Sequence, residues 1–173
     1  MESLIRNPGV TPGPKRSSAS IQEIRVGAEL AAEQLQVIAA ADTLFVASAH
    51  PERGVDASYR GGQPGFVHVL DSKRLRIPDY AGNSMFNTLG NFSANPAAGL
   101  LFPEFNHGLT LQLTGQAKLL WDQPDVAGET GGTRRFWEFT VEHWLETSAG
   151  LDLEWEFLDS SPFNPTPSVH SLM

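Results

Sequence analysis

Two segments in the middle of the chain combine residue types that could hold a small ligand. The first runs from Ser58 to Phe66 (SYRGGQPGF), where an expected strand leads into a glycine-rich turn. Arg60 is one of only six basic residues between positions 26 and 121, and a guanidinium can hold two phosphate oxygens at once. The glycines allow a ligand to approach the backbone, or simply allow the positive φ of a turn. Taken alone, the segment favours an ordinary hairpin turn.

The second segment runs from Pro78 to Asn91 (PDYAGNSMFNTLGN) and joins the end of a strand to the start of a helix. Asn83 or Ser84 stands where the helix should begin. Free backbone N–H groups and the helix dipole suit a phosphate at such a place. Asn83 could equally be an N-cap without a ligand, which is the commoner role of an isolated asparagine.

Common catalytic and metal-binding signatures do not occur in the sequence. It has no Walker-type phosphate loop, no dinucleotide-type glycine fingerprint and no serine in a strand-to-helix elbow. The five histidines never form a close helical pair with an interposed acid, so local spacing gives no support for a metal site. Asp152, Glu154 and Glu156 alternate with apolar residues, a pattern far more typical of a solvated strand face than of an acid/base pair. Tyr59 and Tyr80 are conceivable proton donors, although such tyrosines more often serve packing.

Composition and charge narrow the function classes. The 173 residues carry 12 Lys plus Arg against 20 Asp plus Glu, a formal net charge of -8, and no cysteine. Disulfides, zinc–thiolate sites, iron–sulfur clusters and a cysteine nucleophile are therefore excluded. Most of the acidity lies in residues 122–173, with 2 basic and 10 acidic groups, and the middle of the chain is close to neutral. A single phosphate is therefore compatible with the middle of the chain.

The sequence predicts a cytoplasmic protein. Its acidity disfavours nucleic acid and anionic lipid as partners. No apolar run approaches the roughly 20 residues of a membrane span. The start, Met1 to Arg6, lacks the basic and apolar regions of a signal peptide.

At this length we expect one domain, residues 20–173, behind a flexible N-terminal arm, residues 1–19. The arm is rich in proline, glycine and serine and cannot bury enough apolar surface to fold. A helix is predicted next, because Ser20 and Glu23 form a capping-box pair and apolar residues up to Ile38 recur near the helical period.

Strand-type sequence with glycine and proline punctuation fills most of the remainder. It predicts a mostly β domain, an antiparallel barrel or sandwich without β-α-β alternation. One short helix interrupts it at Asn83–Ala94, and residues 161–173 should form an extended tail. The strand candidates are Thr43–Ala49, Asp56–Arg60, Phe66–Leu70, Leu75–Pro78, Gly99–Phe102, Leu109–Trp121, Phe136–Leu145 and Leu151–Phe157.

Taken in this order, the segments resemble the FMN-binding split-barrel family related to pyridoxamine 5'-phosphate oxidase, where FMN is flavin mononucleotide. The likeness runs from about Ala41 to Trp121 and rests on the order and spacing of the runs 43–50, 60–69, 75–91, 95–96, 99–102 and 111–117. The runs 155–157 and 161–165 resemble an uncharacterised branch of that family. The resemblance implies a split Greek-key barrel of about six antiparallel strands, and a homodimer with FMN at the subunit interface.

The resemblance also implies a set of cofactor-binding residues. Pro78 and Asp79 match the strand that lines the flavin ring and ribityl chain. Ser58, Tyr59 and Arg60 match the adjacent strand, with Arg60 as the cation for the FMN phosphate. At the helix start, Asn83 and Ser84 match the positions that meet the phosphate, and Thr110 matches a polar residue that contacts the ring from across the barrel.

Two departures from the family pattern limit what can be transferred. The vitamin-processing oxidases have an Arg-Lys pair where this chain has Ser84 and Met85, so we expect modest FMN affinity. Those oxidases also end in a Trp- and Arg-containing signature that binds their substrate, whereas residues 161–173 contain no arginine. Pyridoxamine phosphate is therefore not carried over as substrate.

The leading hypothesis is a homodimeric FMN-dependent oxidoreductase acting on an unidentified small organic molecule, with no side chain assigned as catalytic. One alternative is a non-enzymatic flavin-binding or stress protein, because fold alone does not decide function. Another is a haem or deazaflavin cofactor in the same groove. Haem would favour His50, His68 or His107 as ligands.

Overall fold

The computed structural model describes residues 23–82, 86–104, 108–148 and 164–165, which form one antiparallel sheet and two helices. The helices are α1 (Ala32–Ala40) and α2 (Asn87–Ala94). The strands are β1 (Glu23–Gly27), β2 (Thr43–His50), β3 (Gly54–Gly61), β4 (His68–Val69), β5 (Arg74–Pro78), β6 (Ala97–Glu104), β7 (Leu109–Leu120) and β8 (Phe136–Ser148). The predicted mostly β fold is confirmed. The described residues hold eight strands rather than about six, because β1 and the two-residue β4 join the sheet.

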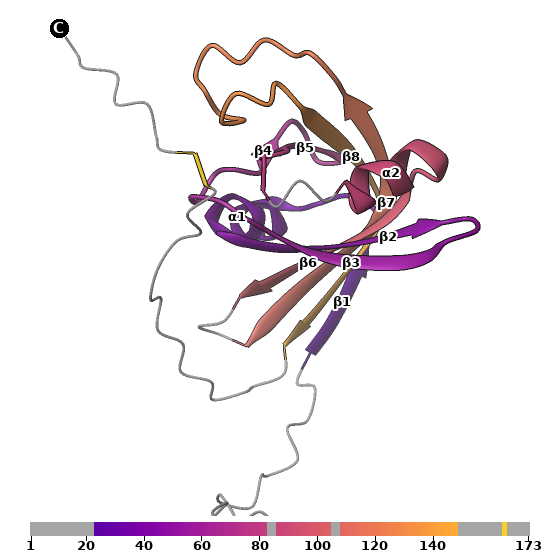
Figure 1. Ribbon diagram of the computed structural model, residues 1–173. Helices are drawn as coiled ribbons and strands as arrows, with labels where there is room; N and C mark the ends of the chain where they lie inside the picture. The colour runs from indigo at the N-terminus through magenta and orange to yellow at the C-terminus, as the bar shows by residue number, and fades with distance from the viewer. Residues whose placement is uncertain (1–22, 83–85, 105–107, 149–163, 166–173) are drawn as a thin grey trace, which may run out of the picture.

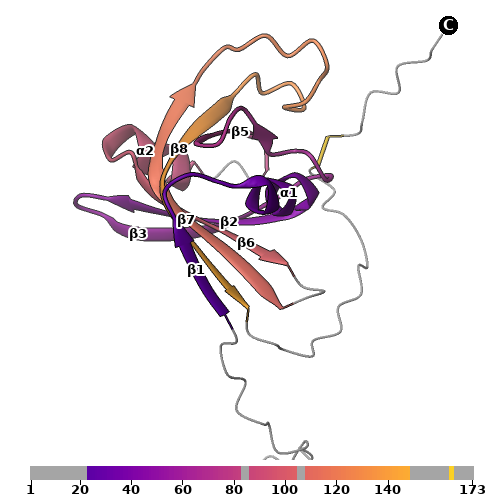
Figure 2. The ribbon, with the colours of Figure 1, turned by 180° about the vertical axis from the view of Figure 1, so that it is seen from behind.

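The sheet is open, as a split barrel requires. Its strand order is β3-β2-β6-β7-β8-β5-β4, so β3 and β4 end the path without pairing to each other. Strand β8 has two neighbours along one edge: residues 136–140 pair with β5, and residues 144–148 pair with β1. Figure 1 shows the consequence, with β4 and β5 beside one end of β8 and β1 beside the other, and Figure 2 shows β1 along that second end from behind.

Local sequence predicted most of the strands correctly. Each candidate between Thr43 and Leu145 overlaps an observed strand. The largest difference is Phe66–Leu70, of which only His68 and Val69 pair in β4, because the Phe66 N–H instead donates to the Gln63 carbonyl at 2.9 Å and closes a turn.

The predicted N-terminal helix is partly wrong. Residues 23–27 form β1, and the helix begins only at Ala32. Pairing with β8 overrides the local helical period, as long-range packing often does in strands. The short connector is held in place by β8, because the Trp144 indole N–H donates to the Glu29 carbonyl at 2.8 Å.

A buried polar chain fixes α1 against the sheet. Gln34 is fully buried, and its side-chain oxygen accepts from the Ala31 N–H at 3.3 Å, at the start of the helix. Its amide nitrogen donates to the Glu146 carboxylate on β8 at 2.8 Å, and Arg25 on β1 donates to the same carboxylate at 3.0 Å. The three elements are therefore joined through one buried acid.

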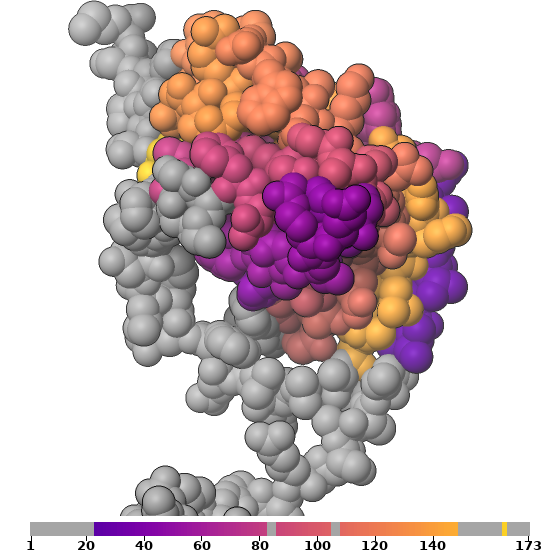
Figure 3. Space-filling model, turned by 45° about the vertical axis from the view of Figure 1, so that its right-hand side comes forward, coloured from indigo at the N-terminus to yellow at the C-terminus, as the bar shows by residue number. Residues whose placement is uncertain are grey.

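Large apolar side chains fill the inner face of the sheet, including Trp137, Phe139 and Phe102, all fully buried. At a register shift between Thr114 and Gly115 of β7, the pairing partner passes from His143 to Val141 of β8, which leaves Glu142 without a partner in this register, as in a β-bulge on β8. Glycine is required there, because a Cβ at Gly115 would overlap the Thr140 carbonyl of β8. In the space-filling view, the β2–β3 hairpin (purple) lies beside α2 (pink), below the β7–β8 loop (orange) (Figure 3).

Several predictions fall on residues outside the described ranges: the arm 1–19, the strand Leu151–Phe157 and most of the tail 161–173. Among the described residues, no helix has the length and apolar character needed to cross a membrane.

Candidate functional site

The two segments singled out in the sequence meet at one cavity of about 510 Å³. Strand β3 supplies one wall with residues 56–61. The end of β5 and the residues after it supply Pro78, Tyr80 and Gly82, and the first turn of α2 supplies Asn87 and Thr88. The cavity therefore lies where a strand end, a connection and a helix start converge.

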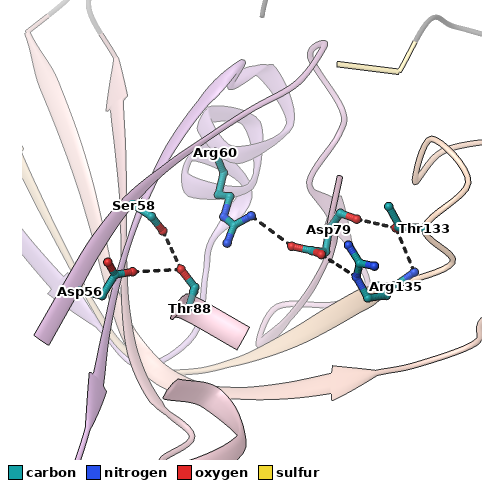
Figure 4. A network of polar contacts seen from close by, with 7 residues as sticks. All are labelled: Asp56, Ser58, Arg60, Asp79, Thr88, Thr133 and Arg135. Carbon is teal, nitrogen blue, oxygen red and sulfur yellow. Dashed lines mark hydrogen bonds and ion pairs between the residues drawn. The ribbon is translucent and has the colours of Figure 1, made fainter. Parts of the chain in front are cut away.

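Three charged side chains form an ion-pair network beside this cavity (Figure 4). The Asp79 carboxylate is buried, with 3 % of the residue exposed. Arg60 Nη1 lies 3.1 Å from its Oδ1, and Arg135 Nε lies 2.8 Å from its Oδ2. Two guanidinium groups against one carboxylate leave a net charge of +1 at this place. Arg60 lines the cavity, so the surplus positive charge is available to an anionic ligand.

Arg135 is the member of this network that the sequence analysis did not single out. It stands immediately before β8, at the end of the long β7–β8 loop, and that loop is fastened to the site because the Thr133 hydroxyl donates to the Asp79 carbonyl at 2.6 Å. One signal was present in the sequence: Arg134 and Arg135 are the only basic residues in the acidic stretch 122–173. Nothing local connects them to Asp79, so the contact needed the structure.

A second polar group holds the helix start against β3. The Ser58 and Thr88 hydroxyls lie 2.8 Å apart, and Thr88 donates to the Asp56 carboxylate at 3.1 Å. Thr88 is buried, so these bonds anchor the first turn of α2 to the strand. Because Asp56 brings negative charge to that helix end, an anion is better placed near Arg60.

The glycine-rich turn after Arg60 makes room for two aromatic rings. A Cβ at Gly61 would collide with the Tyr59 side chain, and one at Gly62 would collide with the Phe66 ring. Both aromatic residues line the cavity. The turn is closed by a hydrogen bond from the Phe66 N–H to the Gln63 carbonyl, and it shapes the cavity wall. It is not the hairpin turn that the sequence favoured, because it joins β3 to β4, which do not pair with each other.

The two tyrosines differ in environment. Burial, assisted by the negative charge of Glu129, raises the pKa of Tyr80 to about 12. The Tyr80 hydroxyl therefore stays protonated at any physiological pH. Tyr59 is 55 % exposed and packs edge-on against Phe45, with ring centroids 5.9 Å apart.

The structure brings together most of the predicted site residues. Ser58, Tyr59, Arg60 and Pro78 line the cavity, and Asp79 pairs with Arg60. Thr110 does not join them within one subunit: it lies on β7, three strands away from β3 in the sheet order, and its hydroxyl is 2.6 Å from that of Thr147.

The predicted helix start is displaced. Helix α2 begins at Asn87, with Phe86 as its N-cap residue, whereas the sequence placed the start at Asn83. Asn83 and Ser84 lie outside the described residues. Phe86 offers no capping oxygen, and no side-chain hydrogen bond caps the helix. Its ring instead lies 5.2 Å from the Arg135 guanidinium.

Two of the proposed haem ligands can be placed. The Nδ1 of His50 accepts from the Glu52 N–H at 3.1 Å in the β2–β3 hairpin, away from the cavity walls. His68 lines a smaller neighbouring cavity, and His107 lies outside the described residues. In the described part of the chain, no three histidine or acidic side chains cluster in a way that could hold a metal ion.

Comparison with known proteins gives a family. The family model described as pyridoxamine 5'-phosphate oxidase matches residues 30–148. A comparison with curated protein sequences gave no match.

Solved structures show the same fold. A variant of HupZ from Group A Streptococcus is similar with a TM-score of 0.52 and 12% identity, over 68% of this chain and 98% of that one. A candidate pyridoxamine 5'-phosphate oxidase from Lactobacillus delbrueckii gives 0.50 and 13%, over 67% and 93%. The haem storage protein HutZ of Vibrio cholerae gives 0.46 and 11%, over 65% and 89%. At these identities the likeness concerns the fold alone.

Proposed function

The chain belongs to the pyridoxamine 5'-phosphate oxidase family, and we propose that it is a homodimeric FMN-binding oxidoreductase acting on a small organic molecule. When bound, the flavin supplies the hydride or electron chemistry. The protein's own residues bind and orient the cofactor and exclude water around it.

One observation carries the proposal: Arg60 stands in the wall of the large cavity with hydrogen-bonding capacity to spare. Its Nη1 is used by Asp79, while its buried Nε has no hydrogen-bond partner among the described residues. A buried unpaired donor is costly, and a phosphate that lets the guanidinium reorient would satisfy it. The net charge of +1 on the network of Arg60, Asp79 and Arg135 favours the same ligand.

The rest of the cavity fits the other parts of FMN. Pro78 and Phe66 offer apolar surface for a ring system, and Ser58, Asn87 and Thr88 offer groups that can bond to a ribityl chain. A volume of about 510 Å³ lies within the range of ordinary cofactor pockets.

The exposed aromatic surface beside the cavity supports a dimer. Tyr59 and Phe45 are 55 % and 40 % exposed, on the adjacent strands β3 and β2, and Tyr59 also lines the cavity. A second subunit placed over these rings would bury them and close the cavity. In such a dimer, Thr110 of the second subunit could reach the cofactor. Sedimentation equilibrium tests the dimer directly.

The first experiment is the visible spectrum of the purified protein before and after addition of FMN. A bound flavin band supports the proposal. Failure to bind FMN at micromolar concentration overturns it, and a Soret band in its place would indicate haem.

Arg60→Ala tests the phosphate contact. Removing a charge-assisted hydrogen bond should weaken FMN by about ten- to a hundredfold, and riboflavin, which lacks the phosphate, should bind as before. Arg74→Ala is the matched control, because Arg74 pairs with Asp71 at an exposed site. Equal loss of FMN and riboflavin would show that Arg60 does not hold the phosphate.

A further experiment distinguishes an enzyme from a non-enzymatic flavin-binding protein. The bound flavin is reduced anaerobically with NADH or NADPH and then reoxidised with candidate acceptors. Turnover with any acceptor supports an oxidoreductase. A flavin that binds but is never reduced by either nicotinamide would favour the non-enzymatic flavin-binding alternative.

A further inference from the structure

A second cavity of about 230 Å³ adjoins the proposed cofactor site. The two cavities share Phe66, Pro78 and Tyr80 as lining residues, so a molecule in the smaller one would lie next to a ligand in the larger. The smaller cavity also receives His68 from β4 and Glu129 from the β7–β8 loop. Of these walls, the β7–β8 loop with Glu129 had no role in the sequence analysis.

The charged lining of this second cavity is acidic. Its described lining residues include one fixed charge, the carboxylate of Glu129, and no lysine or arginine. The Glu129 carboxylate lies 3.9 Å from the His68 Nε2, an ion pair only when the histidine is protonated. The same carboxylate acts on the Tyr80 hydroxyl, whose pKa it helps to raise. The negative potential of Glu129 thus reaches into the cavity.

Glu129 is held in place by the loop that carries it. The next residue, Thr130, is fully buried, and both its N–H and its hydroxyl donate to the Asp125 carboxylate. The Arg134 N–H in turn donates to the Thr130 hydroxyl at 2.8 Å. Although the Glu129 side chain is 47% exposed, its backbone is therefore well anchored beside the cavity.

The described residues around this cavity offer little to offset its charge. The nearest cationic side chain on the adjacent strand is Arg76, the pairing partner of His68, but its guanidinium lies 4.5 Å from the Phe136 ring centroid and donates to Gln123. It does not line the cavity. The segments 83–85, 105–107, 149–163 and 166–173 contain no lysine or arginine in their sequence. No part of the chain after position 82 that lies outside the described residues can therefore add one.

The other walls are apolar or neutral. Phe66 and Pro78 give flat apolar surface, and Tyr80 and Gln63 give hydrogen-bonding groups at its edge. A ligand would place a compact apolar body against the first pair and a polar group toward Glu129.

We propose that this second cavity binds a small organic cation, a protonated amine on a compact apolar or aromatic body. Phosphorylated and carboxylated molecules are disfavoured, because the described lining offers them the Glu129 carboxylate and no lysine or arginine. The claim that this cavity binds an organic cation depends only on its own lining residues. The further claim that this cation is the substrate of a neighbouring flavin rests on the proposed function.

A series of probes with one ring and different charge tests the proposal. Benzylamine is a cation, benzyl alcohol is neutral and benzoate is an anion at pH 7. Titration calorimetry on the protein as purified should give the affinity order amine, alcohol, carboxylate, with benzylamine at least about tenfold tighter than benzoate. Benzoate binding as tightly as benzylamine would overturn the proposal.

Glu129→Gln assigns the effect to the cavity. It should weaken benzylamine about three- to fivefold, as expected for a half-exposed charge, and leave benzyl alcohol unchanged. The matched control is Glu142→Gln, an exposed carboxylate on β8 that bonds to Gln116 and lines neither cavity. An equal effect of the two substitutions on benzylamine would show that the preference is a general consequence of the acidic chain.

Calorimetry also separates this proposal from the one on FMN. Ordered binding of the three probes to flavin-free protein supports the amine site whether or not FMN binds. If FMN binds with the predicted dependence on Arg60 and the probes show no order by charge, the amine site alone is refuted.

Discussion

Arg60 and Asp79 are joined by an ion pair of 3.1 Å that links the end of β3 to the end of β5. Both residues belong to the cofactor site that the family resemblance implies, but no local sequence pattern pairs them. The pair determines how much positive charge is available to a phosphate. If Asp79 had Arg60 as its only partner, the charges would cancel. Because Arg135 binds the other carboxylate oxygen at 2.8 Å, a net positive charge remains.

Asp79→Asn should destabilise the fold. It leaves two arginines, each about one-fifth exposed, facing each other across a neutral side chain in a buried position. Loss of one partner from such a network costs about 2–3 kcal/mol of unfolding free energy, below the value for a fully buried pair because the arginines keep some contact with water. Urea unfolding measures it. The exposed Asp71→Asn, which breaks the pair with Arg74, should leave the unfolding midpoint nearly unchanged.

Arg135→Ala should weaken FMN without removing any contact to it. The substitution leaves Arg60 and Asp79 as a neutral pair, so the phosphate loses a favourable charge at a distance. We expect a three- to tenfold loss of FMN affinity, about 1 kcal/mol at the effective dielectric of a partly exposed site, and no change for riboflavin. Fluorescence titration of the flavin measures both.

Arg134→Ala is the matched control for Arg135→Ala. Its side chain donates to the carbonyls of Asp122 and Gln123 and makes no contact with Asp79. FMN affinity that is the same in both variants would contradict the role of net charge at the network.

Local pattern predicted the sheet well and the first helix poorly, for one physical reason. Strands such as Leu109–Leu120 can be recognised because apolar and polar side chains alternate along them, as expected for a strand with one buried face. The residues 23–27 also carry apolar side chains at positions compatible with a helix, and only pairing with β8 makes them a strand. That information lies in residues 144–148, far away in the sequence.

The candidate site was predicted to a similar extent. The cavity is lined by Ser58, Tyr59, Arg60 and Pro78. These residues could be singled out from the sequence because each lies at the end of a strand that local pattern predicts. Arg135 was missed because it reaches Asp79 through a loop whose course local sequence does not specify. Thr110 is assigned to the ring by family resemblance, and its position three strands away is consistent with a contact made across a dimer.

Tyr80 should titrate at unusually high pH. The chain has 2 tyrosines, so in Tyr59→Phe the tyrosinate absorbance reports Tyr80 alone. Its midpoint should lie at about 12 in the folded protein and at about 10 after denaturation, because burial disfavours the phenolate. The raised pKa contributes stability that is complete below pH 10 and is lost as the pH rises toward 12. A folded midpoint near 10 would show that the Tyr80 hydroxyl is solvated and that burial does not raise its pKa.

Gly27→Ala should destabilise the junction between β1 and β8. A Cβ at Gly27 would lie 2.6 Å from the Trp144 indole, which is itself fixed by its hydrogen bond to the Glu29 carbonyl. Because the ring cannot move without losing that bond, overpacking should cost about 1–3 kcal/mol of unfolding free energy.

Gly90→Ala, in helix α2, should have the opposite effect. Gly90 lies inside α2, and a Cβ there would meet no atom within 4 Å. Alanine should therefore stabilise the protein by about 0.4–1 kcal/mol through helix propensity and a less flexible unfolded chain. Thermal unfolding of the two variants should shift in opposite directions. A Gly27→Ala variant as stable as the parent would mean that β1 is not pressed against Trp144.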